Sequence, residues 1–134
     1  MREILFRGKR RDNGEWVYGS LITERNMFDE NLMTRHIQDI EEPYADNLID
    51  GETIGQYTGL TDKNGRKIFE GDIVEFYDYC NGGTCIGKIE YSDEDTAFQI
   101  MYDETYCLLL GYNFHGLELE VIGNIHDNPE LLNE

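Results

Sequence analysis

The chain has 134 residues, of which 40% are hydrophobic and 12% aromatic, and its formal net charge is −17. This length suits one domain or two small lobes, and the apolar content can form a core, which excludes global disorder. The charge is uneven: residues 1–67 hold 13 acidic and 10 basic side chains, whereas residues 68–134 hold 15 acidic ones against Lys88. Such a surface repels phosphates, so general DNA or RNA binding is disfavoured.

The N-terminus has no apolar segment of signal-peptide length, and no apolar run approaches the length of a membrane span. The three cysteines, Cys80, Cys85 and Cys107, are an odd number in a chain without an export signal, which favours reduced thiols. We therefore expect a cytoplasmic protein that does not contact a membrane.

The first 23 residues are predicted to form a β-hairpin. Segments 3–8 and 15–23 have the composition of strands, and Asn13-Gly14 between them is typical of a tight hairpin turn. Alternation along the second strand places Trp16, Tyr18 and Ser20 on one face and the residues between them on the other.

Residues 24–52 are predicted to be rich in loops, with one or two short strands. The segment MTRHIQDI, residues 33–40, reads either as a strand or as one turn of a helix. The whole region is a candidate for a mobile segment or one that a partner orders.

The stretch IGQYTGLTDKNGRKIFEGDIVEF, residues 54–76, is predicted to be a hairpin followed by a strand. Asn64-Gly65 has turn chemistry, and Gly71-Asp72 is typical of the bend that begins a strand in small SH3-like barrels. The glycines match neither a phosphate-binding P-loop nor a dinucleotide fingerprint, so a structural role is favoured.

Further strands are predicted over residues 85–92, 97–103, 105–113 and 117–125, and Pro129 begins a short terminal helical turn pinned by Leu131 and Leu132. The chain is therefore expected to be all-β, with short antiparallel strands in a small SH3-like barrel or sandwich. We expect a single domain over residues 1–134. Within it, an N-terminal hairpin lobe, residues 1–52, is expected to pack on a barrel-like lobe, residues 53–134.

Basic residues gather at the two predicted turns. They are Arg7, Lys9, Arg10 and Arg11 at the first turn, and Lys63, Arg66 and Lys67 at the second. For the first group we expect contact with an acidic patch of this chain or of a neighbouring subunit, with nucleic acid as the less favoured alternative. For the second group the simple interpretation is solvation, and the alternative is contact with an anion or a partner. An aromatic side chain beside a basic turn is a plausible anchor for a partner. The predicted contact residues are Trp16, Tyr18, Tyr57, Lys63, Arg66 and Lys67.

No constellation of catalytic residues is evident, so we expect a protein that is not an enzyme and that has no metal or other cofactor. Metal-capable groups occur at Cys80, Cys85, Cys107, His115 and His126, but their spacing matches no zinc pattern. Cys107 with His115 would make a nucleophile pair that lacks an orienting third group.

Three blocks, FRGKRRDNGEWVYGSL, TIGQYTGLTDKNGRKIFEGDIV and EVIGNIHDNPELL, resemble the signature blocks of the YopX-like family of phage and prophage proteins. The resemblance extends from Met1 to Leu132 and is weaker over residues 24–52 and 77–115. It implies a small, β-rich protein in the cytoplasm of a phage-infected or lysogenic bacterium. The family is mostly uncharacterised, so the resemblance brings no catalytic residues to this chain.

The leading hypothesis is a non-enzymatic phage accessory protein that acts through contacts with an unknown protein partner, with a homo-oligomer as one form of this. A second hypothesis is an acidic mimic of nucleic acid that inhibits a host nucleic-acid-binding enzyme. A third is a metal protein or enzyme that uses the cysteines and histidines.

Overall fold

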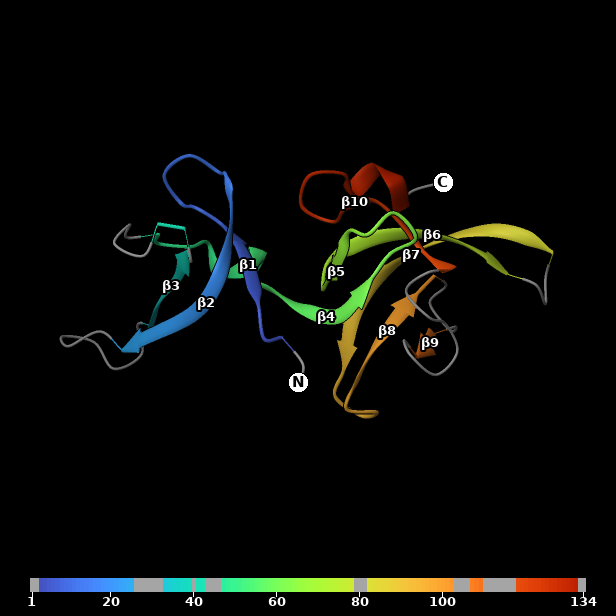
Figure 1. The fold of residues 1–134 in the computed structure, drawn as a ribbon, viewed down its shortest axis with the longest axis horizontal. Coiled ribbons are helices and arrows are strands. Elements are labelled where there is room, and N and C mark those ends of the chain that lie inside the picture. The colour runs from blue at the N-terminus through green and yellow to red at the C-terminus, as the bar shows by residue number, and fades with distance from the viewer. Residues whose placement is uncertain are drawn as a thin grey trace. The chain divides into compact units, whose positions relative to one another are not determined.

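The computed structural model describes residues 3–25, 33–39, 41–42, 47–78, 82–102, 107–109 and 118–132, and it shows a mainly β protein (Figure 1). The strands are β1 Phe6–Lys9, β2 Trp16–Arg25, β3 Met33–Asp39, β4 Gly55–Thr61, β5 Lys67–Phe69, β6 Asp72–Asp78, β7 Gly83–Ser92, β8 Ala97–Met101, β9 Cys107–Leu109 and β10 Glu120–Asn124. Two 3₁₀ turns accompany them, η1 Gly51–Thr53 and η3 Pro129–Leu132.

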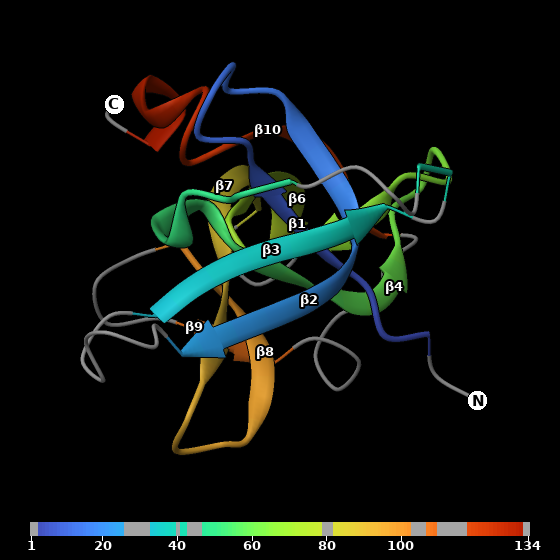
Figure 2. The same cartoon turned by 90° about the vertical axis from the view of Figure 1, so that its left-hand side faces the viewer.

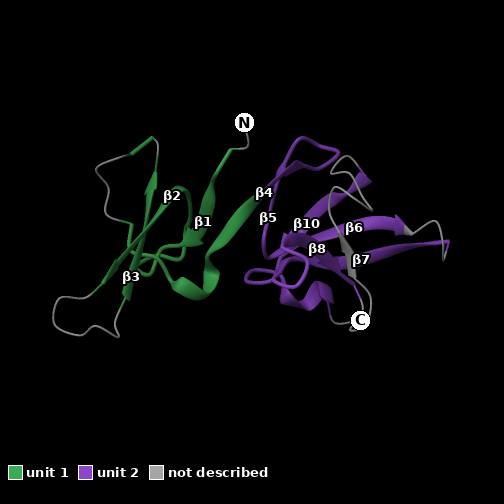
Figure 3. Ribbon diagram, turned by 90° about the horizontal axis from the view of Figure 1, so that it is seen from below, with its two compact units in different colours: residues 1–57 green, residues 58–134 purple. Residues whose placement is uncertain are grey.

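The strands form two five-stranded antiparallel sheets, in the orders β3-β2-β1-β4-β5 and β10-β6-β7-β8-β9. The all-β class is thereby confirmed, and the described strands do not close into a barrel. The chain divides into two compact units, Met1–Tyr57 and Thr58–Glu134, here called unit 1 and unit 2 (Figure 3). The division between these two units falls within β4. No helix among the described residues is long and apolar enough to cross a membrane.

Unit 1 is built on the long ladder between β2 and β3, which pairs every residue from Gly19 to Arg25 with one from Met33 to Asp39 (Figure 2). The segment that read as strand or helical turn is therefore a strand. Val17, Ile37 and Ile49 form the buried core of the unit. Val17 is buried and Tyr18 is exposed, which confirms the predicted faces of β2.

The predicted first hairpin is present, but its turn is wider than the two residues expected. Lys9 pairs with Trp16, so residues 10–15 form the loop. Gly14 takes a φ of +72°, whereas Asn13 is not among the described residues with positive φ. The Asn13 side chain instead accepts a hydrogen bond of 2.9 Å from the Glu15 N–H. This local side-chain bond is an alternative to the tight turn and explains the wider loop.

Unit 2 packs its core between the inner faces of its strands. The buried residues are Ile68, Val74, Phe76, Ile89, Ile100, Leu119 and Val121. The expected bend before β6 is confirmed, because Asp72 Oδ2 accepts a hydrogen bond of 2.8 Å from the Phe69 N–H. The predicted strands at residues 97–103, 105–113 and 117–125 contain β8, β9 and β10, and the terminal turn is η3. The strand predicted at residues 85–92 is β7, which begins two residues earlier, at Gly83.

Candidate functional site

One face of the unit 1 sheet carries a cluster of two cations and two aromatic rings. Arg7 and Lys9 of β1 lie directly opposite Tyr18 and Trp16 of β2, so all four side chains leave the same face. The guanidinium carbon of Arg7 lies 4.7 Å from the centroid of the Trp16 ring, and Lys9 Nζ lies 5.4 Å from it. We call these four residues the aromatic cluster.

The aromatic cluster combines a fixed centre with an accessible edge. Both cations lie within the distance at which the ring quadrupole of Trp16 attracts them. Arg7 is buried, with 6% of its surface exposed, whereas Tyr18 is 45% exposed. The arrangement therefore offers a phenol ring and positive charge on a surface that the strand ladder holds in place.

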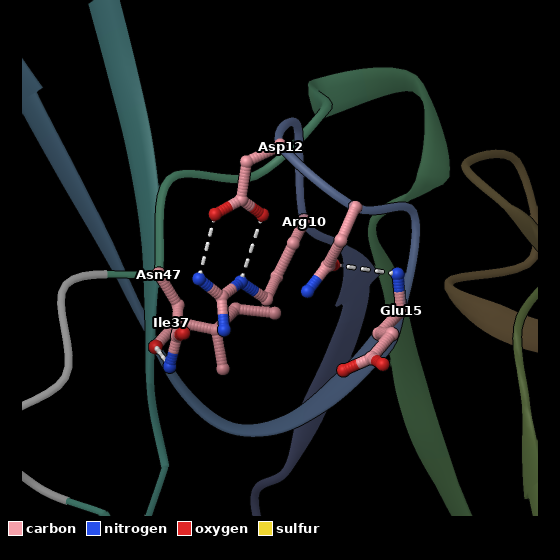
Figure 4. A network of polar contacts seen from close by, with 6 residues as sticks. Arg10, Asp12, Glu15, Ile37 and Asn47 are labelled. Atoms are coloured by element: carbon pink, nitrogen blue, oxygen red, sulfur yellow. Dashed lines mark hydrogen bonds and ion pairs between the residues drawn. The ribbon is translucent and has the colours of Figure 1, made fainter.

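A basic hollow of about 480 Å³ adjoins this cluster, because Lys9 belongs to both. Its lining residues are Lys9, Arg10, Arg11, Gly14 and Asp50. Asp12 holds Arg10 in place through hydrogen bonds of 3.0 Å to Nε and 2.7 Å to Nη2 (Figure 4). The Arg11 side chain is exposed and has no hydrogen-bond or ion-pair partner in the described part of the chain. The hollow thus keeps at least one cation available to an anionic group.

The segment 47–50 supports the loop that forms the basic hollow. Asn47 Nδ2 donates to the Ile37 carbonyl over 3.2 Å, which anchors the segment to β3 (Figure 4). The Arg11 N–H then donates to the Leu48 carbonyl over 3.0 Å, and the Asp50 N–H to the Lys9 carbonyl over 2.9 Å. These backbone bonds fix the position of the hollow on unit 1.

The second group of predicted contact residues lies in unit 2 and stabilises the fold locally. Lys63 Nζ forms an ion pair of 3.3 Å with Glu120, and Arg66 Nη1 donates to the Val121 carbonyl over 3.4 Å. Lys67 is exposed at the start of β5. The turn between β4 and β5 is therefore fastened to β10 by its own cations.

The six predicted contact residues are thus split between the two units. Trp16 and Tyr18 belong to the aromatic cluster of unit 1, as described above. Tyr57 also lies in unit 1, but only 7% of its surface is exposed, so we assign its ring to packing rather than to contact with a partner.

The same turn holds Asp62, which the turn pattern alone predicts to be solvated but which is fully buried. Its buried carboxylate accepts hydrogen bonds from the N–H groups of Asn64 (2.9 Å), Arg66 (2.8 Å) and Val121 (2.9 Å). Burial alone would raise its pKa, but these three bonds and the Arg66 charge together lower the pKa below the ordinary 3.8. Asp two residues before Asn64 fits a turn, but nothing in the sequence indicates the bond to β10.

The metal-capable residues are only partly described. Cys80 and His115 lie outside the described residues, and Cys107 is described only as part of β9. Cys85 is half-buried and lines a hollow of about 470 Å³ beside η3. Within the described ranges, no three His, Cys, Asp or Glu residues come together as metal ligands would.

The fold and this surface define a small, mainly β protein with two open sheets and a cation–aromatic cluster on the first. The chain matches the family model described as YopX protein over residues 5–133, and it belongs to that family. The resemblance noted in the three sequence blocks is thereby confirmed.

A solved structure extends this relationship to the whole fold. The crystal structure of protein EF1440 from Enterococcus faecalis superposes with a TM-score of 0.58 at 27% sequence identity, covering 99% of this chain and 100% of that chain. A search of curated proteins gives no match.

Proposed function

We propose that this chain is a non-enzymatic binding module that acts through protein–protein contacts, in the cytoplasm of a phage-infected or lysogenic bacterium. The aromatic cluster of unit 1 is its contact surface. The observation that carries the proposal is the arrangement of Arg7 and Lys9 around the Trp16 ring, beside the exposed Tyr18.

This arrangement has the composition of an interaction hot spot. Trp, Tyr and Arg are enriched among the residues that dominate the binding energy of protein interfaces, and the rings of Trp and Tyr bury a large area at little cost in conformational entropy. The cations of the cluster favour a partner with an acidic surface. A nucleic-acid partner fits less well, because the net charge of −17 repels a polyanion at long range.

The test is affinity capture from the lysate of a phage-induced host, with nuclease treatment, using the wild-type chain and Tyr18→Ala. We expect recovery of the bound protein to fall about tenfold or more, because a hot-spot ring is lost. The matched control is Tyr91→Ala, which removes a ring of similar exposure, 44% against 45%, from unit 2.

Equal recovery with wild type and Tyr18→Ala would contradict the proposed surface. Capture that nuclease abolishes would contradict a protein partner. Capture that free DNA competes away would instead support mimicry of nucleic acid by the acidic half of the chain.

A further inference from the structure

The basic hollow of unit 1 presents charge that its own surroundings do not neutralise. Arg10 is already paired with Asp12, and Arg10 keeps 30% of its side chain exposed. Arg11 is exposed at the same hollow and has no side-chain partner among the described residues. A carboxylate that entered the hollow would therefore pair with Arg11 without breaking an existing side-chain contact.

Unit 2 carries the opposite feature on the outer face of its sheet. Glu75 of β6 and Glu120 of β10 lie directly opposite each other, an arrangement of like charges that destabilises a pair of strands. Lys63 neutralises Glu120 over 3.3 Å. Glu75 has no ion pair or side-chain hydrogen bond among the described residues. An external cation beside Glu75 would therefore relieve repulsion as well as form a new pair.

The surroundings of Glu75 have the mixed character of an interface. Tyr77 lies two residues along β6 on the same face and is 47% exposed. Ile86 of β7 lies opposite Glu75 and, with Leu131 and others, lines the hollow of about 470 Å³ beside η3. We call Glu75, Tyr77, Ile86 and Glu120 the acidic face.

We propose that the basic hollow of one copy of this chain binds the acidic face of a second copy. The inference rests on the proposed function, and it names a second copy of the chain as the partner of the basic hollow. Unit 1 holds 7 of the chain's 11 basic residues, whereas unit 2 holds 16 acidic and 4 basic ones. Two of those four, Lys63 and Lys88, already form ion pairs within unit 2. The contact joins different surfaces, so it closes into a ring or reciprocal dimer, or extends as a filament.

Sedimentation velocity over a range of protein concentrations tests this association at about 50 mM and about 500 mM salt, where the Debye length falls several-fold. We expect self-association at low salt that weakens at high salt. Arg11→Glu and Glu75→Arg should each raise the dissociation constant about tenfold or more, since each places like charges at the contact.

Mixing the two variants is the decisive step. In an alternating assembly of Arg11→Glu with Glu75→Arg, every contact again joins one acid to one base, so association should return. The double variant with both substitutions in one chain should also associate. Controls with the same charge changes elsewhere, Arg25→Glu in unit 1 and Glu94→Arg in unit 2, should behave as wild type because both residues are exposed outside the proposed contact.

A wild-type chain that stays monomeric at low salt overturns the inference, as does an association that neither single variant weakens. A mixture that remains dissociated overturns the specific pairing of Arg11 with Glu75. These results leave the capture experiment with Tyr18→Ala untouched, so failure of self-association is distinguishable from failure of the proposed function.

Discussion

At Gly65 the backbone takes a φ of +82°, a left-handed conformation that side chains with branched β-carbons resist. We expect Gly65→Val to lower the free energy of unfolding by at least about 1 kcal/mol. We assign this loss to backbone strain, because no atom lies within 4 Å of a Cβ added at this position. Thermal or urea melts measure the change. Gly83→Val is the control, since Gly83 has the same open space without a positive φ. Identical melts for both variants would contradict the strained turn.

Asp62 joins the same turn to β10. Its Oδ1 accepts hydrogen bonds within the turn, and its Oδ2 accepts one from the Val121 N–H of β10. In Asp62→Asn one oxygen can still accept from Asn64 and Arg66, but the amide nitrogen then faces the Val121 N–H. A buried donor without an acceptor costs about 1–3 kcal/mol, so we expect a loss of stability in that range in urea unfolding at neutral pH. Unchanged stability would show that the bond to Val121 contributes little.

The lowered pKa of Asp62 gives this contribution a pH dependence of known sign. A carboxyl whose pKa is lower in the folded chain stabilises the fold above the ordinary pKa of 3.8, and this stabilisation is lost as the pH falls through the folded value. The difference in stability between wild type and Asp62→Asn should therefore be constant near neutral pH and shrink below about pH 4. Urea unfolding of both proteins across this range measures it, and a difference that grows on acidification would contradict the assignment.

At the level of elements, β2 and β3 approach so closely that Gly19 cannot carry a side chain. A Cβ at this position would overlap the carbonyl oxygen of Gln38, a backbone atom that cannot rotate away. We expect Gly19→Ala to cost about 1–3 kcal/mol by overpacking and to expose the β3 amides to hydrogen exchange. Gly83→Ala, in open space on β7, is the control. Normal protection of β3 in Gly19→Ala would contradict this close contact.

Short-range patterns in the sequence predicted most elements because their causes are local. Gly71-Asp72 predicted the bend before β6, and the Asp72 bond to the Phe69 N–H lies within that bend. The remaining contacts depend on strand register within a hairpin or on pairing between distant segments, and local patterns encode neither. Asp62 meets Val121 across 59 positions. Arg7 meets Trp16 only because the register aligns Lys9 with Trp16.

At the level of the whole molecule, the buried clusters described for unit 1 and unit 2 have no residue in common. Ile37 is fully buried in the core of unit 1, and Ile89, at 1% exposure, is buried in that of unit 2. A cavity at either position should cost about 2–5 kcal/mol, since the lost methyl groups leave packing that relaxes only in part. If the two units unfold independently, this loss of stability stays within the unit that contains the cavity.

Hydrogen exchange measured by mass spectrometry on Ile37→Ala and Ile89→Ala shows whether each cavity destabilises one unit or both. We expect Ile37→Ala to speed exchange over residues 1–57 and to leave residues 58–134 near wild type, because cooperative opening follows units with a common core. Ile89→Ala is the reciprocal variant and should give the opposite pattern. Faster exchange across both units in either variant would mean that the chain opens as one cooperative body, and β4, which passes from one unit into the other, would then be the element that couples them.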